Sequence, residues 1–298
     1  MTQDSSANDS RILKIFNYVG GTLIFLGIAY FIANNWSILN NFTRIFTTLG
    51  SAIAAFMAGA LFHASHKYES AASAFFMISG LLLPIGLGVT LIVSNVSWGP
   101  EEANLLIFGI SLAAFMLALF YSPRAVFLLF TIIFASLFYL SLISFLTSEY
   151  TFYYDHLLDY EVIALGSGYI FLGYYLDSNN LPALSGPLYF FGGLFVLFES
   201  FTMGSNFFIG YNQPRWEIVT GILIILSFAF SVPLKSKSFL YLGAIFLILY
   251  IGDISSRFIE LFGDLGWSLI LVIMGLVLML IGYLVFVIHK KINRIKLD

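Results

Sequence analysis

Six polar or aromatic residues interrupt or border long apolar stretches, and they are the residues best suited to bind a solute in this chain. They are Asn34, Asn35, Trp36, Arg44, Glu199 and Asp253. Amides, a guanidinium and carboxylates can bind ions or polar groups, and ionisable side chains inside lipid are costly enough to indicate a function. We therefore predict that these six residues bind a substrate or line a gate.

A structural interpretation stands beside the functional one at the first four positions. Trp36 directly follows an apolar stretch, which is typical of an anchor at the membrane surface, and paired Asn residues commonly end helices. Arg44 opens the next apolar stretch on the predicted outer side, where the positive-inside rule disfavours it. An acid such as Glu199 or Asp253, or a lipid phosphate, would hold the guanidinium, and a substrate anion is the functional alternative.

Glu199 and Asp253 occupy similar depths in their apolar stretches. Each lies about fifteen residues from the inner end of its predicted helix, or roughly 23 Å at 1.5 Å per residue. That position is near the outer edge of the hydrocarbon region. A shift of the helix boundaries by one turn would make both residues ordinary loop acids, so the sequence leaves both interpretations open.

The sequence contains no convincing metal site or catalytic set. It has no cysteine, which excludes disulfide bonds, thiolate ligands and cysteine nucleophiles. His63 and His66 have a spacing that fits two ligands on one helix face, but a solvated helix end is the favoured interpretation. His156, between Asp155 and Asp159, is a weak metal candidate. We predict no bound metal, no cofactor and no enzymatic activity.

Composition predicts that lipid rather than water surrounds most of the chain. Of 298 residues, 60% are hydrophobic and 10% are charged, whereas roughly a quarter are charged in soluble domains. A soluble fold of this length exposes too much surface to hide 33 Phe residues and the accompanying aliphatic side chains. The net charge of -3 and the lack of a basic cluster argue against a nucleic-acid partner. The predicted partner is a lipid bilayer, together with either a small-molecule substrate or a membrane protein.

The lengths of the apolar stretches predict an all-α, polytopic transmembrane helix bundle. A helix needs about 20 apolar residues to cross roughly 30 Å of hydrocarbon, and this criterion gives about ten spans. The predicted spans are 15–34, 43–63, 71–95, 103–121, 125–146, 160–176, 184–202, 216–232, 239–255 and 267–289. Short breaks with turn-forming or charged residues separate them, which favours antiparallel helical hairpins.

The distribution of Lys and Arg predicts that both the N-terminus and the C-terminus are cytoplasmic. With ten spans, ten of the 13 basic residues face the inside, as the positive-inside rule requires. They are Arg11, Lys14, Lys67, Arg124, Lys235, Lys237, Lys290, Lys291, Arg294 and Lys296. Residues 1–10 are polar and are predicted to be a disordered tail. Residues 11–298 are predicted to form a single integral membrane domain.

That domain shows a weak internal repeat at a spacing of about sixty residues. Residues 20–36 and 79–98 both read as glycine-bearing apolar helices that end in Asn and Trp. The helices that follow share the string Ala-Ala-Phe-Met, at 54–57 and at 113–116. Repeated helical hairpins would explain this pattern, and chance similarity between apolar helices explains it equally well.

A family resemblance rests on residues 27–36, GIAYFIANNW, followed by Arg44 and a helix rich in small residues. This arrangement resembles the bacterial predicted-membrane-protein family called domain of unknown function twenty-one fifty-seven. Its members similarly have a glycine-rich first helix that ends in Ala-x-Asn-Trp and an Arg that enters the second helix. The likeness extends weakly through residues 122–125, SPRA, and the chain departs from it in lacking the soluble region that often precedes the first helix. The resemblance implies a bacterial inner-membrane protein with no known activity.

Two classes of function fit these observations. A carrier of a small solute or metabolite would have about ten spans, both termini inside and internal repeats, with the polar residues above lining one gate. Against a carrier, the predicted middle of the bilayer holds few polar residues, whereas carriers usually bind substrate there. The alternative is a non-catalytic membrane scaffold or assembly subunit, in which buried polar residues set the helix packing.

Overall fold

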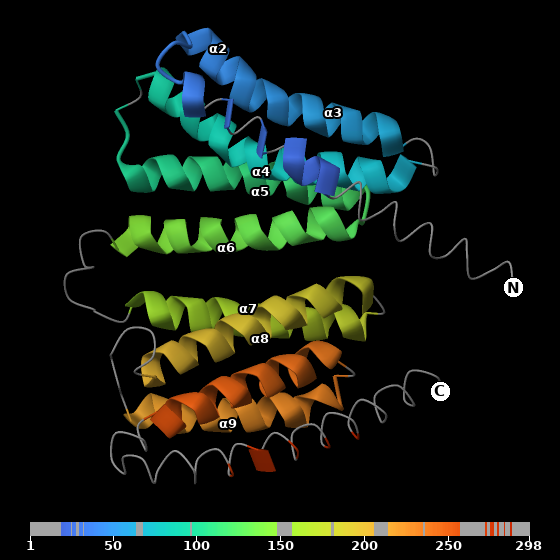
Figure 1. The fold of residues 1–298 in the computed structure, drawn as a ribbon, viewed down its shortest axis with the longest axis vertical. Helices are drawn as coiled ribbons and strands as arrows, with labels where there is room; N and C mark the ends of the chain where they lie inside the picture. Colours follow the sequence, from blue (N-terminus) through green and yellow to red (C-terminus); the bar gives the residue numbers. More distant parts are fainter. Residues whose placement is uncertain are drawn as a thin grey trace, which may run out of the picture. The chain divides into compact units, whose positions relative to one another are not determined.

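The computed structural model describes seven longer stretches of the chain and some short pieces near its two ends. The stretches are 33–63, 68–95, 97–147, 157–179, 182–205, 214–234 and 236–256, and the pieces fall between 19 and 31 and between 272 and 287. Within these residues, every regular element is a helix (Figure 1). The chain divides into two compact units, Met1–Glu149 and Tyr150–Asp298, which we call unit 1 and unit 2 and describe separately.

Unit 1 is built from antiparallel helical hairpins. Its described helices are α2 (Asn41–Ile45), the π-helical segment η1 (Phe46–Gly50), α3 (Ser51–His63), α4 (Glu69–Val93), α5 (Pro100–Tyr121) and α6 (Ala125–Thr147). The first three run on without a break, α3 packs mainly on α4, and α5 packs mainly on α6. Asn40 caps the start of α2. Its side chain accepts a hydrogen bond from the Thr43 amide at 2.8 Å, which satisfies an amide that has no partner within the helix.

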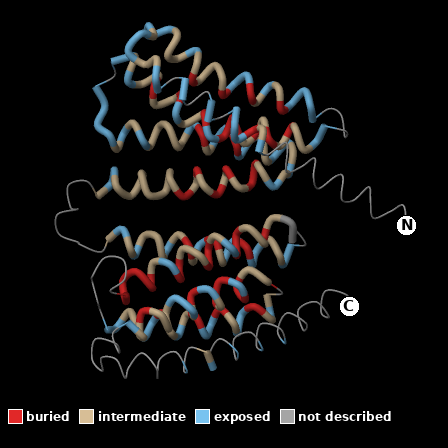
Figure 2. Tube along the Cα trace, in the orientation of Figure 1, coloured by how far each residue is buried: buried red, intermediate tan, exposed pale blue. Residues whose placement is uncertain are grey.

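The core of unit 1 is an aromatic cluster between α3, α4, α5 and α6. The Phe127 ring lies 4.6 Å from the Phe76 ring, between centroids, and 6.1 Å from the Phe115 ring. Phe130 continues the cluster along α6 and packs against Gly80 of α4, where a methyl group would overlap its ring. In unit 1, the buried positions are concentrated on α4 and on the first half of α6 (Figure 2).

Unit 2 contains four described helices. They are α7 (Leu157–Ser178), α8 (Pro182–Gly204), α9 (Pro214–Ser231) and Lys237–Ser256. The helices α7 and α8 approach backbone to backbone, since a methyl group at Gly166 would lie 2.8 Å from the Gly192 carbonyl oxygen. Close approach at small residues is how helices gain van der Waals contact in lipid.

Seven helices in the described residues are long and apolar enough to cross a membrane, and each overlaps one of the predicted spans. They are Asn41–His63, Glu69–Val93, Pro100–Tyr121, Ala125–Thr147, Leu184–Gly204, Pro214–Ser231 and Lys237–Ser256. The predicted span 160–176 is helical as part of α7, but its glycines, tyrosines and acids make α7 less apolar than these seven. Most of the predicted first and tenth spans, and the tail 1–10, lie outside the described residues.

Candidate functional site

The first group of predicted site residues forms a local structure at the entrance to α2. The Arg44 guanidinium donates two hydrogen bonds to the Trp36 carbonyl oxygen, from Nε at 3.2 Å and from Nη2 at 2.8 Å. Its central carbon also lies 4.8 Å from the centroid of the Trp36 ring, a cation–π contact. The Asn35 amide donates to the Phe31 carbonyl oxygen at 3.0 Å, and Asn34 is exposed. Each interaction spans eight residues or fewer, so this group stabilises its own turn.

These contacts bear on the predicted partner of Arg44. Among the described residues of unit 1, the guanidinium is held by a backbone carbonyl and an indole ring rather than by a carboxylate. Glu199 and Asp253 both belong to unit 2, so their pairing with Arg44 stays a prediction. The ring and the carbonyl oxygen of Trp36 both contact Arg44, and the role of Trp36 as an anchor at the membrane surface stays a prediction.

The π-helical segment η1 begins two residues after Arg44 and packs against the glycine region of α4. A methyl group at Gly86 would lie 2.5 Å from the Leu49 Cα atom, so only glycine allows this approach. The Thr48 hydroxyl donates to the Arg44 carbonyl oxygen at 2.7 Å. Pro84 lies inside α4, which continues through it to Val93. The helix α4 is therefore not broken at Pro84.

Glu199 lies in the last two turns of α8 and meets a second carboxyl group. The side chain of Asp159, near the start of α7, lies within hydrogen-bonding reach of it. The Thr202 hydroxyl also approaches, at 2.9 Å from the Glu199 carbonyl oxygen and 3.4 Å from its Oε1. Glu199 is therefore an interhelical residue, and its interpretation as a loop acid is wrong.

Asp253 is the most deeply buried acid among the described residues, with 3% of its surface exposed. The Ser205 hydroxyl, directly after α8, donates to Asp253 Oδ1 at 2.5 Å. Glu217 and Thr220 of α9 and Tyr250 lie around the same point. Asp253 lies within the helix Lys237–Ser256, so a loop position is wrong for this residue as well.

Four acids of unit 2 lie at one end of its helices, which we call the acidic end: Asp159, Glu199, Glu217 and Asp253. This end lies where α7 and α9 begin and where α8 ends. The Tyr160 and Trp216 rings, with centroids 5.9 Å apart, join the starts of α7 and α9. The Thr220 hydroxyl donates to the Ser200 carbonyl oxygen at 2.7 Å and joins α9 to α8. Polar contacts thus link all four helices near this end.

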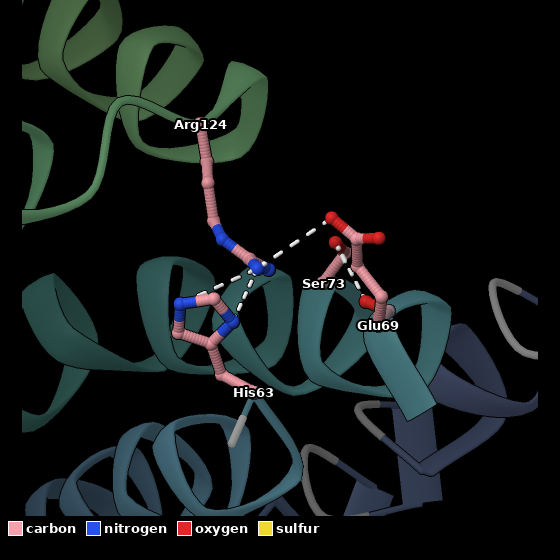
Figure 3. A network of polar contacts seen from close by, with 4 residues as sticks. All are labelled: His63, Glu69, Ser73 and Arg124. Atoms are coloured by element: carbon pink, nitrogen blue, oxygen red, sulfur yellow. Dashed lines mark hydrogen bonds and ion pairs between the residues drawn. The ribbon is translucent and has the colours of Figure 1, made fainter. Parts of the chain in front are cut away.

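A second polar cluster, in unit 1, was missed by the sequence analysis. Arg124, at the start of α6, donates to His63 Nδ1 at the end of α3, and its Nη2 atom lies 3.5 Å from Glu69 Oε1 at the start of α4 (Figure 3). The Ser73 hydroxyl donates to the Glu69 carbonyl oxygen at 3.1 Å. The signal was available, because antiparallel hairpins bring the end of one helix beside the start of the next. The cluster ties three helices together and uses His63 as a hydrogen-bond acceptor.

Unit 2 also contains a cavity of about 410 Å³ between α7, α8 and α9. Apolar side chains form most of its wall, including Ile170, Val196 and Leu226. Ser167 and Ser227 also line the cavity. Their hydroxyls donate to carbonyl oxygens of their own helices, at 2.8 and 2.7 Å. The wall therefore offers an occupant mainly apolar contact.

The described residues contain no group of three or more His, Asp or Glu side chains that could hold a metal ion. His66 and His156 lie outside the described residues. His63 accepts a hydrogen bond from Arg124 through Nδ1. The predicted absence of a metal and of a cofactor stays a prediction for the chain as a whole.

Comparison with known proteins agrees with a membrane protein. A search of curated proteins found no match to this chain. Residues 1–127 match a family model, and they cover α2 to α5 and the first residues of α6. The family is described as "Predicted membrane protein (DUF2157)", and this match confirms the resemblance that residues 27–36 and Arg44 indicated.

Proposed function

We propose that this chain is a carrier of a small solute in the bacterial inner membrane, with ten spans and both termini in the cytoplasm. Seven apolar helices and α7 support eight of these spans. The excess of Lys and Arg on one side supports the orientation. The resemblance to a bacterial membrane family supports the location.

The observation that carries the proposal is the cavity between α7, α8 and α9. Its volume of about 410 Å³ is within the range of small-molecule sites. The wall residues from α8 and α9 lie inside helices long and apolar enough to span the membrane. An apolar wall resolves the objection that the middle of the bilayer holds few polar residues, because a largely apolar substrate needs few polar partners.

The acidic end of unit 2 supplies a gate in this proposal. Glu199 and Asp253 lie on helices whose other residues form or support the cavity wall. The hydrogen bond from Ser205 to Asp253 and that from Thr220 to Ser200 hold this end together. Opening the cavity towards the acidic end would require these contacts to break. Arg44, Trp36 and the neighbouring asparagines instead anchor the hairpin of unit 1.

A thermal-stability screen of the purified protein against small metabolites and lipids tests the proposal. A specific ligand at a hundredfold excess over its dissociation constant stabilises a protein by about 2.7 kcal/mol. We expect at least one compound to raise the melting temperature, and Leu226→Trp, which fills the cavity, to abolish the rise. Ile225→Trp is the matched control, because Ile225 is 69% exposed and does not belong to the cavity wall.

The same compound should cross the membrane of proteoliposomes only when the wild-type protein is present. If the compounds bind to the wild-type protein and to Leu226→Trp equally well, the cavity is not their binding site. A compound that binds in the cavity without being transported would argue against a carrier.

The alternative is a non-catalytic scaffold or assembly subunit. The observation that favours it is the local character of the Trp36–Arg44 contacts, which stabilise a turn without exposing a polar site. Reproducible co-purification of one membrane protein, unaffected by Leu226→Trp, together with a flat ligand screen would favour this alternative.

A further inference from the structure

An open hollow of about 580 Å³ lies along one face of α5 in unit 1. Trp98 lines it just before the start of α5, and Phe145 lines it from the end of the neighbouring helix α6. The other lining residues recur at spacings of three and four along α5, which places them on one side of the helix. They include Glu102, Leu105, Leu106 and Ile110.

The hollow is polar at one end and apolar along the rest. Trp98 and Glu102 lie where the candidate membrane span Pro100–Tyr121 begins. Leu106 and Ile110 line the hollow further into the helix, about 6 and 12 Å beyond Glu102 at 1.5 Å per residue. If α5 spans the membrane, the polar end lies near the membrane surface and the apolar part lies in the hydrocarbon.

Both polar lining groups are open to a ligand. The Glu102 Oε2 atom accepts a hydrogen bond from the Gly99 amide at 3.2 Å. Among the described residues, the Glu102 side chain makes no ion pair and no second hydrogen bond. Trp98 is 46% exposed, and its ring stacks on no ring or cation in the same part of the chain. A carboxylate oxygen and an indole face therefore point to a ligand site.

These two groups favour a cation. A carboxylate attracts positive charge, and the face of an indole ring binds ammonium groups. None of the described residues that line the hollow is Lys or Arg, so a phosphate would lie beside Glu102 without a basic partner, and the like charges would repel. The same repulsion disfavours a phospholipid, whose phosphate would have to lie at the polar end.

We propose that this hollow binds a single-chain amphipathic cation, an alkyl chain that ends in an ammonium group. The ammonium contacts the Glu102 carboxylate and the Trp98 ring. The chain packs on Leu106, Ile110 and Phe145. This site lies within unit 1 and is separate from the cavity between α7, α8 and α9, so it goes beyond the proposed carrier function.

Binding of radiolabelled decyltrimethylammonium to the full-length protein in mild detergent tests the proposal. We expect saturable binding that decanol, which has the same chain and no charge, does not displace. Glu102→Gln should weaken binding about fivefold, the effect of one exposed ion pair. Glutamine also suits this position of a helix cap, so the melting temperature should not change. Glu101→Gln is the matched control, because Glu101 lies in the same turn and does not line the hollow.

Three outcomes of this assay would overturn the proposal. Glu102→Gln could bind the cation as tightly as the wild-type protein. The two glutamine variants could lose affinity equally, in which case the net charge rather than the hollow decides binding. Decanol could displace the label as well as the unlabelled cation does, in which case the hollow selects only the chain.

Two further variants test the ring and the chain. Trp98→Leu should weaken binding about threefold, the effect of one exposed cation–π contact. Ile110→Trp fills the apolar part of the hollow and should weaken binding more strongly. Leu117→Trp is its control on the same helix, because Leu117 is 61% exposed and does not line the hollow. Equal affinity in these two tryptophan variants would show that the chain does not occupy the hollow.

The variant Leu226→Trp separates this site from the proposed carrier cavity. It fills the cavity of unit 2, and we expect it to bind decyltrimethylammonium as the wild-type protein does. If it loses binding while Ile110→Trp keeps it, the cation occupies the cavity of unit 2 and the proposal for unit 1 is wrong. Binding that is lost in Ile110→Trp alone supports the site in unit 1, whether or not the protein transports a solute.

Discussion

The two units solve the problem of helix association in lipid by different means. In unit 1, the core is a cluster of phenylalanine rings, and its described polar groups bond mainly within one turn or at the helix ends. In unit 2, hydroxyl and carboxyl groups join one helix to another, and a cavity of about 410 Å³ remains between three helices. Unit 1 also has an open hollow, of about 580 Å³, lined by residues of α5 together with Trp98 and Phe145. The hydrogen bonds between helices, rather than the presence of a cavity, therefore distinguish unit 2.

The difference matters because lipid tails compete with apolar side chains for helix surfaces. Helices in a bilayer associate through close packing and hydrogen bonds rather than through release of water. The helices of unit 1 associate mainly through close packing, and those of unit 2 are also joined by hydrogen bonds at the acidic end. We place the proposed site in unit 2, because its cavity lies between three helices and has a largely apolar wall.

The largest expected effect is in the aromatic core of unit 1. Phe127→Ala should lower the free energy of unfolding by about 3 kcal/mol, the low end for Phe→Ala in cores, because removing the ring leaves a cavity beside Phe76 and Phe115. The loss of stability is measured by unfolding the detergent-solubilised protein with heat or with added SDS. Phe120→Ala is the control, since Phe120 is 86% exposed and should change stability little. Similar losses in the two variants would contradict an aromatic core.

An intermediate effect is expected where α8 meets the helix Lys237–Ser256. Ser205→Ala removes a hydrogen bond to a buried carboxyl group and should lower the free energy of unfolding by about 2 kcal/mol, as losing a hydrogen bond to a charged group does. Thermal unfolding with and without the substitution gives the difference.

The matched control for Ser205 is Ser167→Ala. The Ser167 hydroxyl donates only to the Ile163 carbonyl oxygen of its own helix, so its removal should change stability by less than about 0.5 kcal/mol. If both serine variants are equally stable, polar contacts between helices do not distinguish unit 2.

The smallest effect is expected at the turn of unit 1. Arg44→Lys keeps the positive charge but loses the stacked guanidinium and one of its two donors to Trp36. The expected cost is about 1 kcal/mol, measured as a lower melting temperature. Arg215→Lys, at an exposed position, should have no measurable effect. A loss of ligand or lipid binding in Arg44→Lys with unchanged stability would instead return Arg44 to the candidate site.

Apolar length and composition were sufficient to predict the helices. Seven predicted spans overlap helices of the structure that are able to cross a membrane. Glu199 and Asp253 lie near the ends of two of these helices, and their depth in the bilayer stays a prediction. The partners of these two acids were harder to predict. Asp159, the partner of Glu199, and Ser205, the partner of Asp253, are both distant from them in the chain. Nothing in their immediate sequence neighbourhood indicates those partners.

By itself, the sequence determined that this chain belongs in a membrane and where its helices run. Both follow from local quantities, namely the apolar content of each stretch and the residues that begin and end helices. Only the tertiary structure decided which polar groups meet, that Trp36 holds Arg44, and that α7, α8 and α9 leave a cavity lined by apolar side chains. These features depend on distances between helices, and apolar side chains with similar hydropathy can pack in many ways. A cavity is a property of packing, so no single stretch of sequence records it.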